Sequence, residues 1–364
     1  MHCTWEICYA HAQDMSPDSA RDTSPIRTGE ELDLAALTSY LSGKLHGAEQ
    51  GIEVEQFPGG HSNLTYLLRA GGLEYVLRRA PLGPVAPKAH DMAREFRVLE
   101  AVHPHFPPAP RVHLLCEDPT VIGAVFYLME RRRGVILRST VPPEYAQHQE
   151  WGARVSQVMV DCLAALHSVD IRRHGLIQLG KPEGYLSRQV GGWAERWRRA
   201  STEDNPAMDE VIRHLTERMP ISGPPTLLHN DYKLDNIMLD PANPGRIAAV
   251  LDWEMATVGD PLSDVGLTLC YWLHAGREPV GGMPEAGGWY TRDQILNRYE
   301  AMTGRDLTGI DWYEVLGIFK LAVIVQQIYF RYVQGQTRDE RFKDFHLRVR
   351  DLIDSARERL EQVR

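Results

Sequence analysis

Apolar and polar residues follow two different periods along this chain, and the period changes near Pro143. Before it, short apolar stretches alternate with polar residues, as half-buried strands do. The pair Gly71-Gly72 separates two of these stretches, which predicts a β-hairpin. Two other stretches have helical spacing. The predicted strands are GIEVEQF (51–57), LTYLLRA (64–70), LEYVLRRA (73–80) and VFYLMERR (125–132), and the predicted helices are 30–45 and MAREFRVLEAV (92–102).

Beyond Pro143 the apolar residues recur three and four positions apart, which predicts long amphipathic helices. The stretch WGARVSQVMVDCLAALHSVD (151–170) is the clearest example. Only two stretches in this part favour strands. The other predicted helices lie around 193–215, 289–302, 311–333 and 344–363, and the two strands are NIMLD (236–240) and RIAAVLDWE (246–254).

The two patterns divide the 364 residues into a polar tail (1–30), a small β-rich N-lobe (31–130) and a mainly helical C-lobe (131–364). This length agrees with about two domains, at roughly 100–200 residues each. We therefore predict an α+β fold of two lobes, preceded by a flexible tail that becomes ordered only by docking.

Composition narrows the classes of function. The formal net charge is -9, whereas a general nucleic-acid binder carries a basic surplus. No apolar run reaches the roughly 18 residues of a membrane-spanning helix, so we expect neither a nucleic-acid partner nor a membrane partner. The five scattered cysteines fit neither a disulfide framework nor a zinc site. We expect a reduced, cytoplasmic protein.

Three polar residues are predicted to meet at one end of a hairpin. The turn-forming segment PANPG (241–245) separates the two strands of the second lobe. Asn236 at the start of the first strand and Asp252 at the end of the second are nearly equidistant from this turn. Because Asp231 comes just before the first strand, all three side chains should converge.

Two carboxylates and an amide at one point would repel and resist desolvation unless a cation joins them. Mg²⁺ takes oxygen ligands and fills the rest of its shell with waters and substrate phosphates. A further acid can accept a proton from a substrate hydroxyl. The order His229, Asp231, Asn236 and then Asp252 matches the protein-kinase pattern H-x-D-x-x-x-x-N followed by a metal-binding aspartate.

The segments HNDYKLDNIML (229–239) and AAVLDWEMATVGDPLSDVG (248–266) resemble the aminoglycoside phosphotransferase family of kinase-like folds. They resemble most the branch that also occurs fused to acyl-CoA dehydrogenases. The resemblance covers roughly residues 30 to 340 and implies a two-lobed protein-kinase-like fold with ATP in the cleft, GTP being an alternative donor.

The resemblance implies a role for each residue of the catalytic segment. Asp231 matches the catalytic base, and Asn236 and Asp252 match the two Mg²⁺ ligands. Lys233 stands where many kinases neutralise the transferring phosphate, and a surface lysine is the alternative. His229 is expected to be a packed core histidine rather than a proton carrier.

The resemblance also implies a nucleotide site in the first lobe. The turn PGGHSN (58–63) matches a phosphate-covering loop, with a plain hairpin turn as the alternative. Arg78 stands where kinases have the lysine that pairs with phosphates, and Glu95 would pair with Arg78. Backbone groups from 129 to 131 should meet the adenine edge. The nucleotide-binding residues are thus Gly59, Gly60, Ser62, Asn63, Arg78, Glu95, Met129 and Glu130.

Three further residues are expected to support the site rather than to bind ligands. Asp260 and Asp264 match positions that brace the catalytic loop or cap a helix. His167 lies on an apolar helix face and is expected to be a satisfied core histidine.

The acceptor substrate is the least determined part of the prediction. The segment GYLSRQVGGWAERWRRA (184–200) is rich in arginine, which suits an anion such as a carboxylate or a CoA ester, with a solvated helix face as the alternative. The related branch indicates a hydroxy acid or hydroxyacyl-CoA in preference to an aminoglycoside. A catalytically silent nucleotide-binding protein on the same fold is the rival hypothesis, and the oligomeric state stays open.

Overall fold

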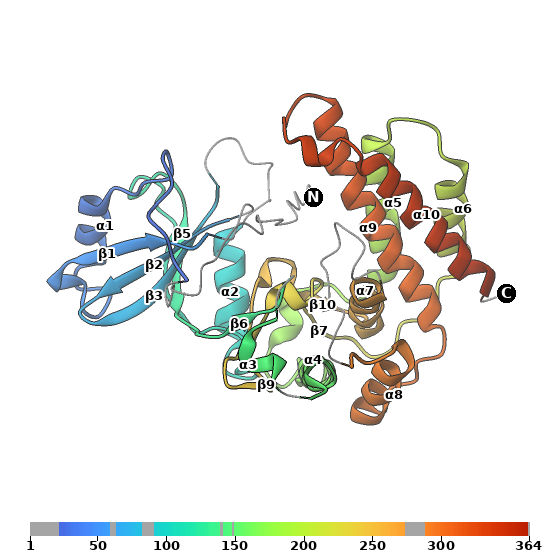
Figure 1. The fold of residues 1–364 in the computed structure, drawn as a ribbon, viewed down its shortest axis with the longest axis horizontal. Helices are drawn as coiled ribbons and strands as arrows, with labels where there is room; N and C mark the ends of the chain where they lie inside the picture. Colours follow the sequence, from blue (N-terminus) through green and yellow to red (C-terminus); the bar gives the residue numbers. More distant parts are fainter. Residues whose placement is uncertain are drawn as a thin grey trace. The chain divides into compact units, whose positions relative to one another are not determined.

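A computed structural model describes residues 22–58, 63–81, 91–138, 141–147, 149–273 and 288–362 (Figure 1). Contacts along the chain divide it into two compact units. Unit 1 comprises the residues up to Val135 together with the segment Ala248–Glu254, and unit 2 comprises Ile136–Ile247 and Met255–Arg364. Each unit is described by itself.

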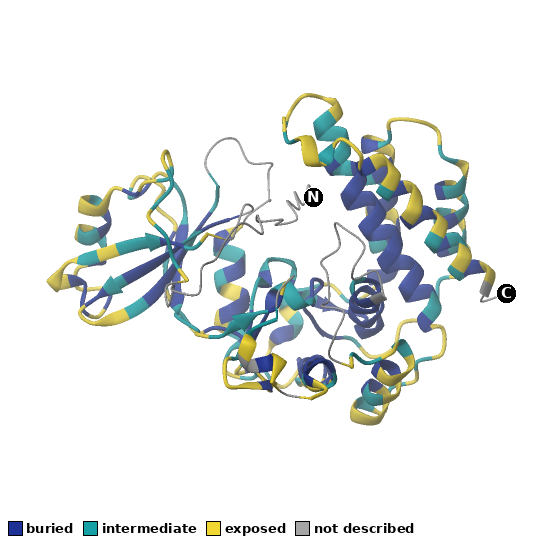
Figure 2. Cartoon of the chain, viewed as in Figure 1, coloured by how far each residue is buried: buried dark blue, intermediate teal, exposed yellow. Residues whose placement is uncertain are grey.

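Unit 1 is built on a five-stranded antiparallel sheet with the order β1-β2-β3-β5-β4. Its core fills with the inward-facing apolar side chains of these strands, and Figure 2 shows the sheet interior as buried. The strands are β1 (Ile52–Gln56), β2 (Leu64–Ala70), β3 (Leu73–Arg79), β4 (Val112–Cys116) and β5 (Phe126–Glu130), and the helices are α1 (Leu34–Leu41) and α2 (Met92–Val102).

The predicted hairpin of unit 1 is confirmed. Ala70 pairs with Leu73 across Gly71 and Gly72, whose φ values of 54° and 79° lie in the left-handed region that glycine tolerates. A Cβ on Gly71 would also lie 2.6 Å from the Cα of Gly47. Glycine is therefore required at this turn both by its conformation and by the close approach of another backbone segment.

Residues 22–30 pair with the edge of this sheet. Ser24 forms an antiparallel bridge with Gln56 on β1, and the side chain of Gln56 accepts a hydrogen bond from the backbone of Arg27 at 2.8 Å. The remainder of the segment predicted as a flexible tail, residues 1–21, lies outside the described residues. The helix predicted over 30–45 is shorter in the structure, because Asp33 caps its start and accepts a hydrogen bond from the backbone of Ala36.

Unit 2 is mainly helical, and α9 runs through its centre with α5, α7 and α10 packed against it (Figure 1). The helix α9 is buried along most of its length (Figure 2). The helices are α3 (Pro143–Ala146), α4 (Trp151–His167), α5 (Tyr185–Ala200), α6 (Pro206–Glu217), α7 (Pro261–Leu273), α8 (Arg292–Thr303), α9 (Ile310–Val333) and α10 (Phe345–Gln362).

Two glycines allow α7 and α9 to approach closely. A Cβ on Gly266 of α7 would lie 2.4 Å from the carbonyl oxygen of Tyr313 on α9. A Cβ on Gly317 of α9 would lie 3.0 Å from the carbonyl oxygen of Gly266. The crossing point therefore brings backbone against backbone, which explains why small residues interrupt two otherwise apolar helices.

The predictions for the second lobe were incomplete in three places. The segment predicted as one helical region, 193–215, forms two helices, α5 and α6. The turn predicted over 241–245 is shorter, because β9 (Asn243–Val250) begins directly after Pro241 and Ala242. Short strands were also missed, since two or three residues carry no readable period. They are β6 (Val135–Ile136), β7 (Thr226–Leu228) and β10 (Thr257–Gly259), beside the predicted β8 (Ile237–Asp240).

One helix among the described residues, α9, is long and apolar enough to cross a membrane by its length and composition. Its most apolar window is 83% buried inside the protein, as expected for the core helix of a folded unit. This burial accounts for its apolar sequence.

Candidate catalytic and nucleotide-binding site

The catalytic loop of unit 2 runs from the end of β7 to the start of β8 and is held by one carboxylate on α7. Asp264 Oδ2 accepts a hydrogen bond from the backbone N–H of His229 and Oδ1 accepts one from that of Asn230, both at 2.7 Å. Asn230 has a φ of 65°, an uncommon left-handed conformation for a residue other than glycine. The bracing role predicted for Asp264 therefore agrees with its contacts.

A buried chain of polar groups supports Asp264 in turn. His167 Nε2 lies 3.3 Å from Asp264 Oδ2, and His167 Nδ1 lies 2.7 Å from the hydroxyl of Tyr299. Burial alone would raise the pKa of Asp264, but the hydrogen bond from His167 and the charges and N–H group around it hold that pKa below its ordinary value. His167 is thus a satisfied core histidine, as predicted.

His229 and Asp260 also have structural contacts. His229 is fully buried, and its Nδ1 accepts a hydrogen bond from the backbone N–H of Asp231 at 3.3 Å. Asp260 accepts hydrogen bonds from the backbone N–H of Leu262 at 3.0 Å and from the hydroxyl of Tyr313 at 2.8 Å. These contacts match the core histidine and the helix-capping aspartate that the sequence predicted.

Asp231 is enclosed by donors from three directions. Its Oδ2 accepts a hydrogen bond from Asn236 Nδ2 at 2.7 Å and lies 3.3 Å from Lys233 Nζ. Its Oδ1 accepts a hydrogen bond from the Tyr271 hydroxyl at 3.0 Å. Only 1% of Asp231 is exposed, so these donors compensate the burial of a carboxylate. The structure thus brings together three of the predicted residues and adds a fourth.

The sequence did not indicate Tyr271 as a site residue, because it lies in the apolar helix segment LTLCYWL, where an aromatic residue is typical of the hydrophobic core. Lys233, which the sequence left undecided between a phosphate ligand and a surface lysine, is mostly buried beside Asp231. The ring centroid of Tyr271 lies 5.2 Å from Lys233 Nζ, within the range of a cation–π contact.

Asn236 contacts Asp231 through the nitrogen of its side-chain amide. Besides the contact with Oδ2, Asn236 Nδ2 donates to the backbone carbonyl of Asp231 at 2.8 Å. Because Nδ2 makes both bonds, Oδ1 is the amide atom that a cation would take.

In unit 1, Arg78 joins two of the predicted site residues. Arg78 Nε on β3 lies 3.3 Å from Glu95 Oε2 on α2, the contact that the sequence predicted. Arg78 Nη2 also lies 2.8 Å from Asp252 Oδ1. Burial lowers the pKa of Arg78, but the carboxylates of Glu95 and Asp252 outweigh burial and hold that pKa well above its ordinary value.

The backbone around Asp252 is fixed by the tryptophan that follows it. Asp252 has a φ of 66°, again left-handed. Trp253 is fully buried, and its ring packs edge-on against Phe106 with the centroids 5.8 Å apart. Its backbone N–H donates to Glu95 Oε1 at 3.2 Å, and its indole N–H donates to the carbonyl of Val250 at 2.8 Å. Trp253 therefore anchors the segment that presents Asp252.

Glu254 is a second residue that the sequence reasoning missed. Its Oε2 accepts a hydrogen bond from Asn63 Nδ2 at 3.2 Å, and Asn63 is buried. Burial and, to a lesser extent, the neighbouring Asp252 raise the pKa of Glu254 to about 8, while Arg78 opposes this rise. The signal for Glu254 was its place two residues after the predicted metal ligand.

Three carboxylates of unit 1 affect the pKa of Arg78. Glu95, Asp252 and Glu254 also affect one another. The described residues contain no group of three His, Cys, Asp or Glu side chains arranged as a metal site. The assignment of Asn236 and Asp252 as Mg²⁺ ligands stays a prediction.

The remaining predicted residues are placed as follows. Gly59, Gly60 and Ser62 lie outside the described residues. Met129 and Glu130 end β5, but the Glu130 N–H donates to the carbonyl of Arg111 at 2.8 Å as part of the sheet edge. That backbone groups from 129 to 131 meet an adenine stays a prediction. Asp231 and Asn236 belong to unit 2 and Asp252 to unit 1, so their convergence stays a prediction.

The arginines of α5 have local partners. Arg198 and Arg199 both pair with Glu195 one turn earlier, at 2.9 and 2.8 Å, and the guanidinium of Arg196 lies 4.3 Å from the ring centroid of Trp193. These contacts favour the solvated helix face over an anion site, which the sequence had left open.

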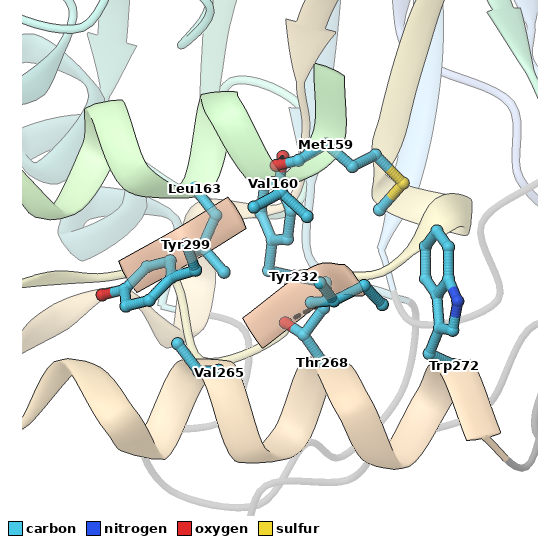
Figure 3. A pocket seen from close by; sticks show the side chains of 9 residues that line it. Met159, Val160, Leu163, Tyr232, Val265, Thr268, Trp272 and Tyr299 are labelled. Atoms are coloured by element: carbon cyan, nitrogen blue, oxygen red, sulfur yellow. Dashed lines mark hydrogen bonds between the residues drawn. The ribbon is translucent and has the colours of Figure 1, made fainter. Parts of the chain in front are cut away.

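A small cavity lies behind the catalytic loop (Figure 3). Its volume is about 10 Å³, far below the several hundred Å³ of a typical ligand pocket. Tyr232 spans it, donating from its hydroxyl to the carbonyl of Met159 at 2.9 Å and accepting at its own carbonyl from the Thr268 hydroxyl at 3.1 Å. The cavity is therefore part of the packing that supports the loop.

Comparison with known proteins agrees with this geometry. The model of the phosphotransferase enzyme family matches residues 53–297. Acyl-CoA dehydrogenase family member 11 of Rattus norvegicus is 34% identical over 337 residues, which cover 90% of this chain and 43% of that protein. The chain thus spans less than half the length of that relative.

Two solved structures share the fold. A protein of Ralstonia eutropha JMP134 that has been assigned as an aminoglycoside phosphotransferase is 31% identical, with a TM-score of 0.78 over 91% of this chain and 99% of that one. A thermostable mutant of the aminoglycoside phosphotransferase APH(4)-Ia, in a complex with ADP and hygromycin B, is 18% identical, with a TM-score of 0.57 over 89% of this chain and 98% of that one. Together with the family match, these likenesses show that the chain belongs to the phosphotransferase enzyme family and has the kinase-like fold of small-molecule kinases.

Proposed function

We propose that this protein transfers the γ-phosphoryl group of ATP to a hydroxyl group of a small molecule. The observation that carries the proposal is the buried carboxylate of Asp231, held by Asn236, Lys233 and Tyr271 in a family of phosphotransferases. A carboxylate fixed in this way is suited to accept a proton from an alcohol.

The chemical step follows from these residues. The acceptor oxygen forms a bond to the γ-phosphorus, the bond from that phosphorus to the bridging oxygen of ADP breaks, and the hydroxyl proton moves to Asp231. Mg²⁺, when bound by Asn236 and Asp252, supplies charge neutralisation at the phosphate oxygens. Lys233, whose Nζ lies 3.3 Å from Asp231 Oδ2, brings a positive charge to the place where the phosphoryl group arrives.

Arg78 would hold the nucleotide phosphates from the side of unit 1. Glu95 fixes its guanidinium at 3.3 Å, and a planar fork binds phosphate oxygens with two N–H groups at once. ATP is the proposed donor, and GTP is the competing donor that a direct comparison of the two nucleotides separates.

We further propose a hydroxy acid or a hydroxyacyl-CoA as the acceptor. The support is the 34% identity to a protein named as an acyl-CoA dehydrogenase family member, of which this chain matches 43%. An aminoglycoside is a weaker candidate, because a polycation would meet the positive charge of Lys233 beside the base. The predicted cytoplasmic location stays a prediction.

The test is ADP formation by purified protein with Mg²⁺ and a panel of acceptors, namely hydroxy acids, hydroxyacyl-CoA thioesters, choline and hygromycin B. We expect turnover with an acid or a thioester, and its loss in Asp231→Asn. The rival function, a silent nucleotide-binding protein, predicts that ATP with Mg²⁺ raises the melting temperature while no member of the panel yields ADP.

A further inference from the structure

One face of α7 contacts three consecutive parts of the catalytic loop. Asp264 accepts the backbone N–H groups of His229 and Asn230. One turn later the hydroxyl of Thr268 donates to the carbonyl of Tyr232 at 3.1 Å. Positions 264, 268 and 271 are four and three residues apart, so they share one face of the helix. The last of them, Tyr271, contacts the carboxylate of the proposed base.

The oxygens of Asp231 are held from two different elements. Oδ2 faces Asn236 and Lys233, which both belong to the catalytic loop itself. Oδ1 accepts its hydrogen bond at 3.0 Å from Tyr271, which belongs to α7. A carboxylate held at one oxygen alone can rotate about its Cβ–Cγ bond, whereas donors at both oxygens fix its plane. Tyr271 therefore ties the orientation of the base to the rigid helix.

The same side chain also contacts Lys233. The ring centroid of Tyr271 lies 5.2 Å from Lys233 Nζ, so one residue restrains both the base and the lysine beside it. Burial raises the pKa of the Tyr271 hydroxyl well above its ordinary value, and the negative Asp231 raises it further. The phenol therefore stays protonated near neutral pH and acts as a donor.

We propose that Tyr271 is a positioning residue that fixes Oδ1 of Asp231 as the atom that receives the acceptor's proton. An oxygen of a carboxylate has two lone pairs. The hydrogen bond from Tyr271 uses one of them, and its direction sets where the second points. The acceptor hydroxyl then approaches Oδ1 along a direction that α7 determines. This inference rests on the proposed function, since it assigns a part of the same site.

The test compares two tyrosine variants in the full chain. Tyr271→Phe removes the hydroxyl and keeps the ring beside Lys233. Tyr145→Phe is the matched control, because Tyr145 is a tyrosine of the same unit whose hydroxyl also donates a hydrogen bond, in this case to the backbone carbonyl of Asp240. With the acceptor identified by the panel, we expect Tyr271→Phe to lower kcat by about 10- to 100-fold, the cost of a misplaced reacting group.

The KM for ATP and the kinetic constants of the control distinguish a positioning role from a general disturbance of the structure. The KM for ATP should stay within about twofold in Tyr271→Phe, and both parameters should stay within about twofold in the control, since neither hydroxyl is assigned to the nucleotide. An unchanged kcat in Tyr271→Phe would overturn the proposal. A raised kcat or a lowered KM for the acceptor would overturn it too, because Tyr271 would then obstruct Oδ1 instead of orienting it.

A second readout is independent of activity. A crystal structure of Tyr271→Phe should show the Asp231 carboxylate rotated away from its present plane, and an unrotated carboxylate would refute the assignment. If the wild-type protein turned over no acceptor, the proposed function would fail, and this structure would still decide the role of Tyr271.

Discussion

Arg78 offers a direct test of the electrostatics of unit 1. Its side chain is 11% exposed and pairs with Glu95, which is 1% exposed, and with Asp252, which is 27% exposed. Replacing Arg78 by Met keeps an apolar stem of similar length and leaves Glu95 as a buried carboxylate without its cation. Breaking a buried pair in this way typically costs about 3–5 kcal/mol.

The lower end of that range is expected here. Glu95 keeps a hydrogen bond from the backbone of Trp253, and Asp252 is partly exposed to water. We therefore expect Arg78→Met to lower the free energy of unfolding by about 3 kcal/mol at pH 8. Arg97→Met is the control, since Arg97 is 62% exposed and pairs with the exposed Glu117, a contact worth less than about 1 kcal/mol.

The pH dependence of this loss has a definite sign. Burial raises the pKa of Glu95 above its ordinary value, and Arg78 opposes that rise, so Arg78→Met raises the pKa of Glu95 further. A carboxyl whose pKa is raised on folding favours the folded state below its unfolded pKa, and this advantage disappears as the pH rises through the folded pKa. The destabilisation should therefore shrink as the pH falls from 8 toward about 5.

Urea unfolding of the metal-free protein, followed by tryptophan fluorescence at both pH values, measures these free energies. A loss below about 0.5 kcal/mol at pH 8, or a loss that grows toward acid, would refute the account of Arg78 as the compensating charge.

Two further predictions concern stability. Because burial raises the pKa of Glu254 to about 8, its protonated form stabilises the folded state, and this stability is lost as the pH rises from the ordinary glutamate range through 8. Glu254→Gln should therefore make urea unfolding less dependent on pH in that interval, and an unchanged dependence would contradict the shift. Gly266→Ala should destabilise the folded protein by about 2 kcal/mol or more, because its Cβ would lie 2.4 Å from the Tyr313 carbonyl oxygen. The control Gly191→Ala, on the open face of α5, should stabilise the folded protein by about 0.5–1 kcal/mol. Equal effects of the two variants in thermal unfolding would count against the α7–α9 contact.

The regular elements and the catalytic loop could be predicted from the sequence because they have strong local signals. The hairpin at Gly71-Gly72, the helix α2 and the long helices of unit 2 have apolar periods of ten residues or more, or a turn with one favoured conformation. Asp231 and Asn236 stand at a fixed spacing that phosphoryl transfer requires. Such features depend on neighbours along the chain.

The missed features depend on neighbours in space. Tyr271 has no polar residue beside it in the sequence and acquires its partner only because α7 packs against the catalytic loop. Glu254 is half-buried and accepts a hydrogen bond from Asn63, which is 191 positions away. The strands β7 and β10 have three residues each, too short for a period.

The most direct test of the central claim is phosphoryl transfer by the wild-type protein and by Asp231→Asn, measured side by side. Asparagine keeps the size of the side chain and removes the proton acceptor, so kcat should fall by about 10²- to 10⁴-fold while the stabilisation by ATP with Mg²⁺ is retained. At equal times, mass spectrometry should detect at most about one hundredth as much phosphorylated acceptor with Asp231→Asn as with the wild type. Equal yields from the two proteins would contradict the assignment of Asp231 as the base.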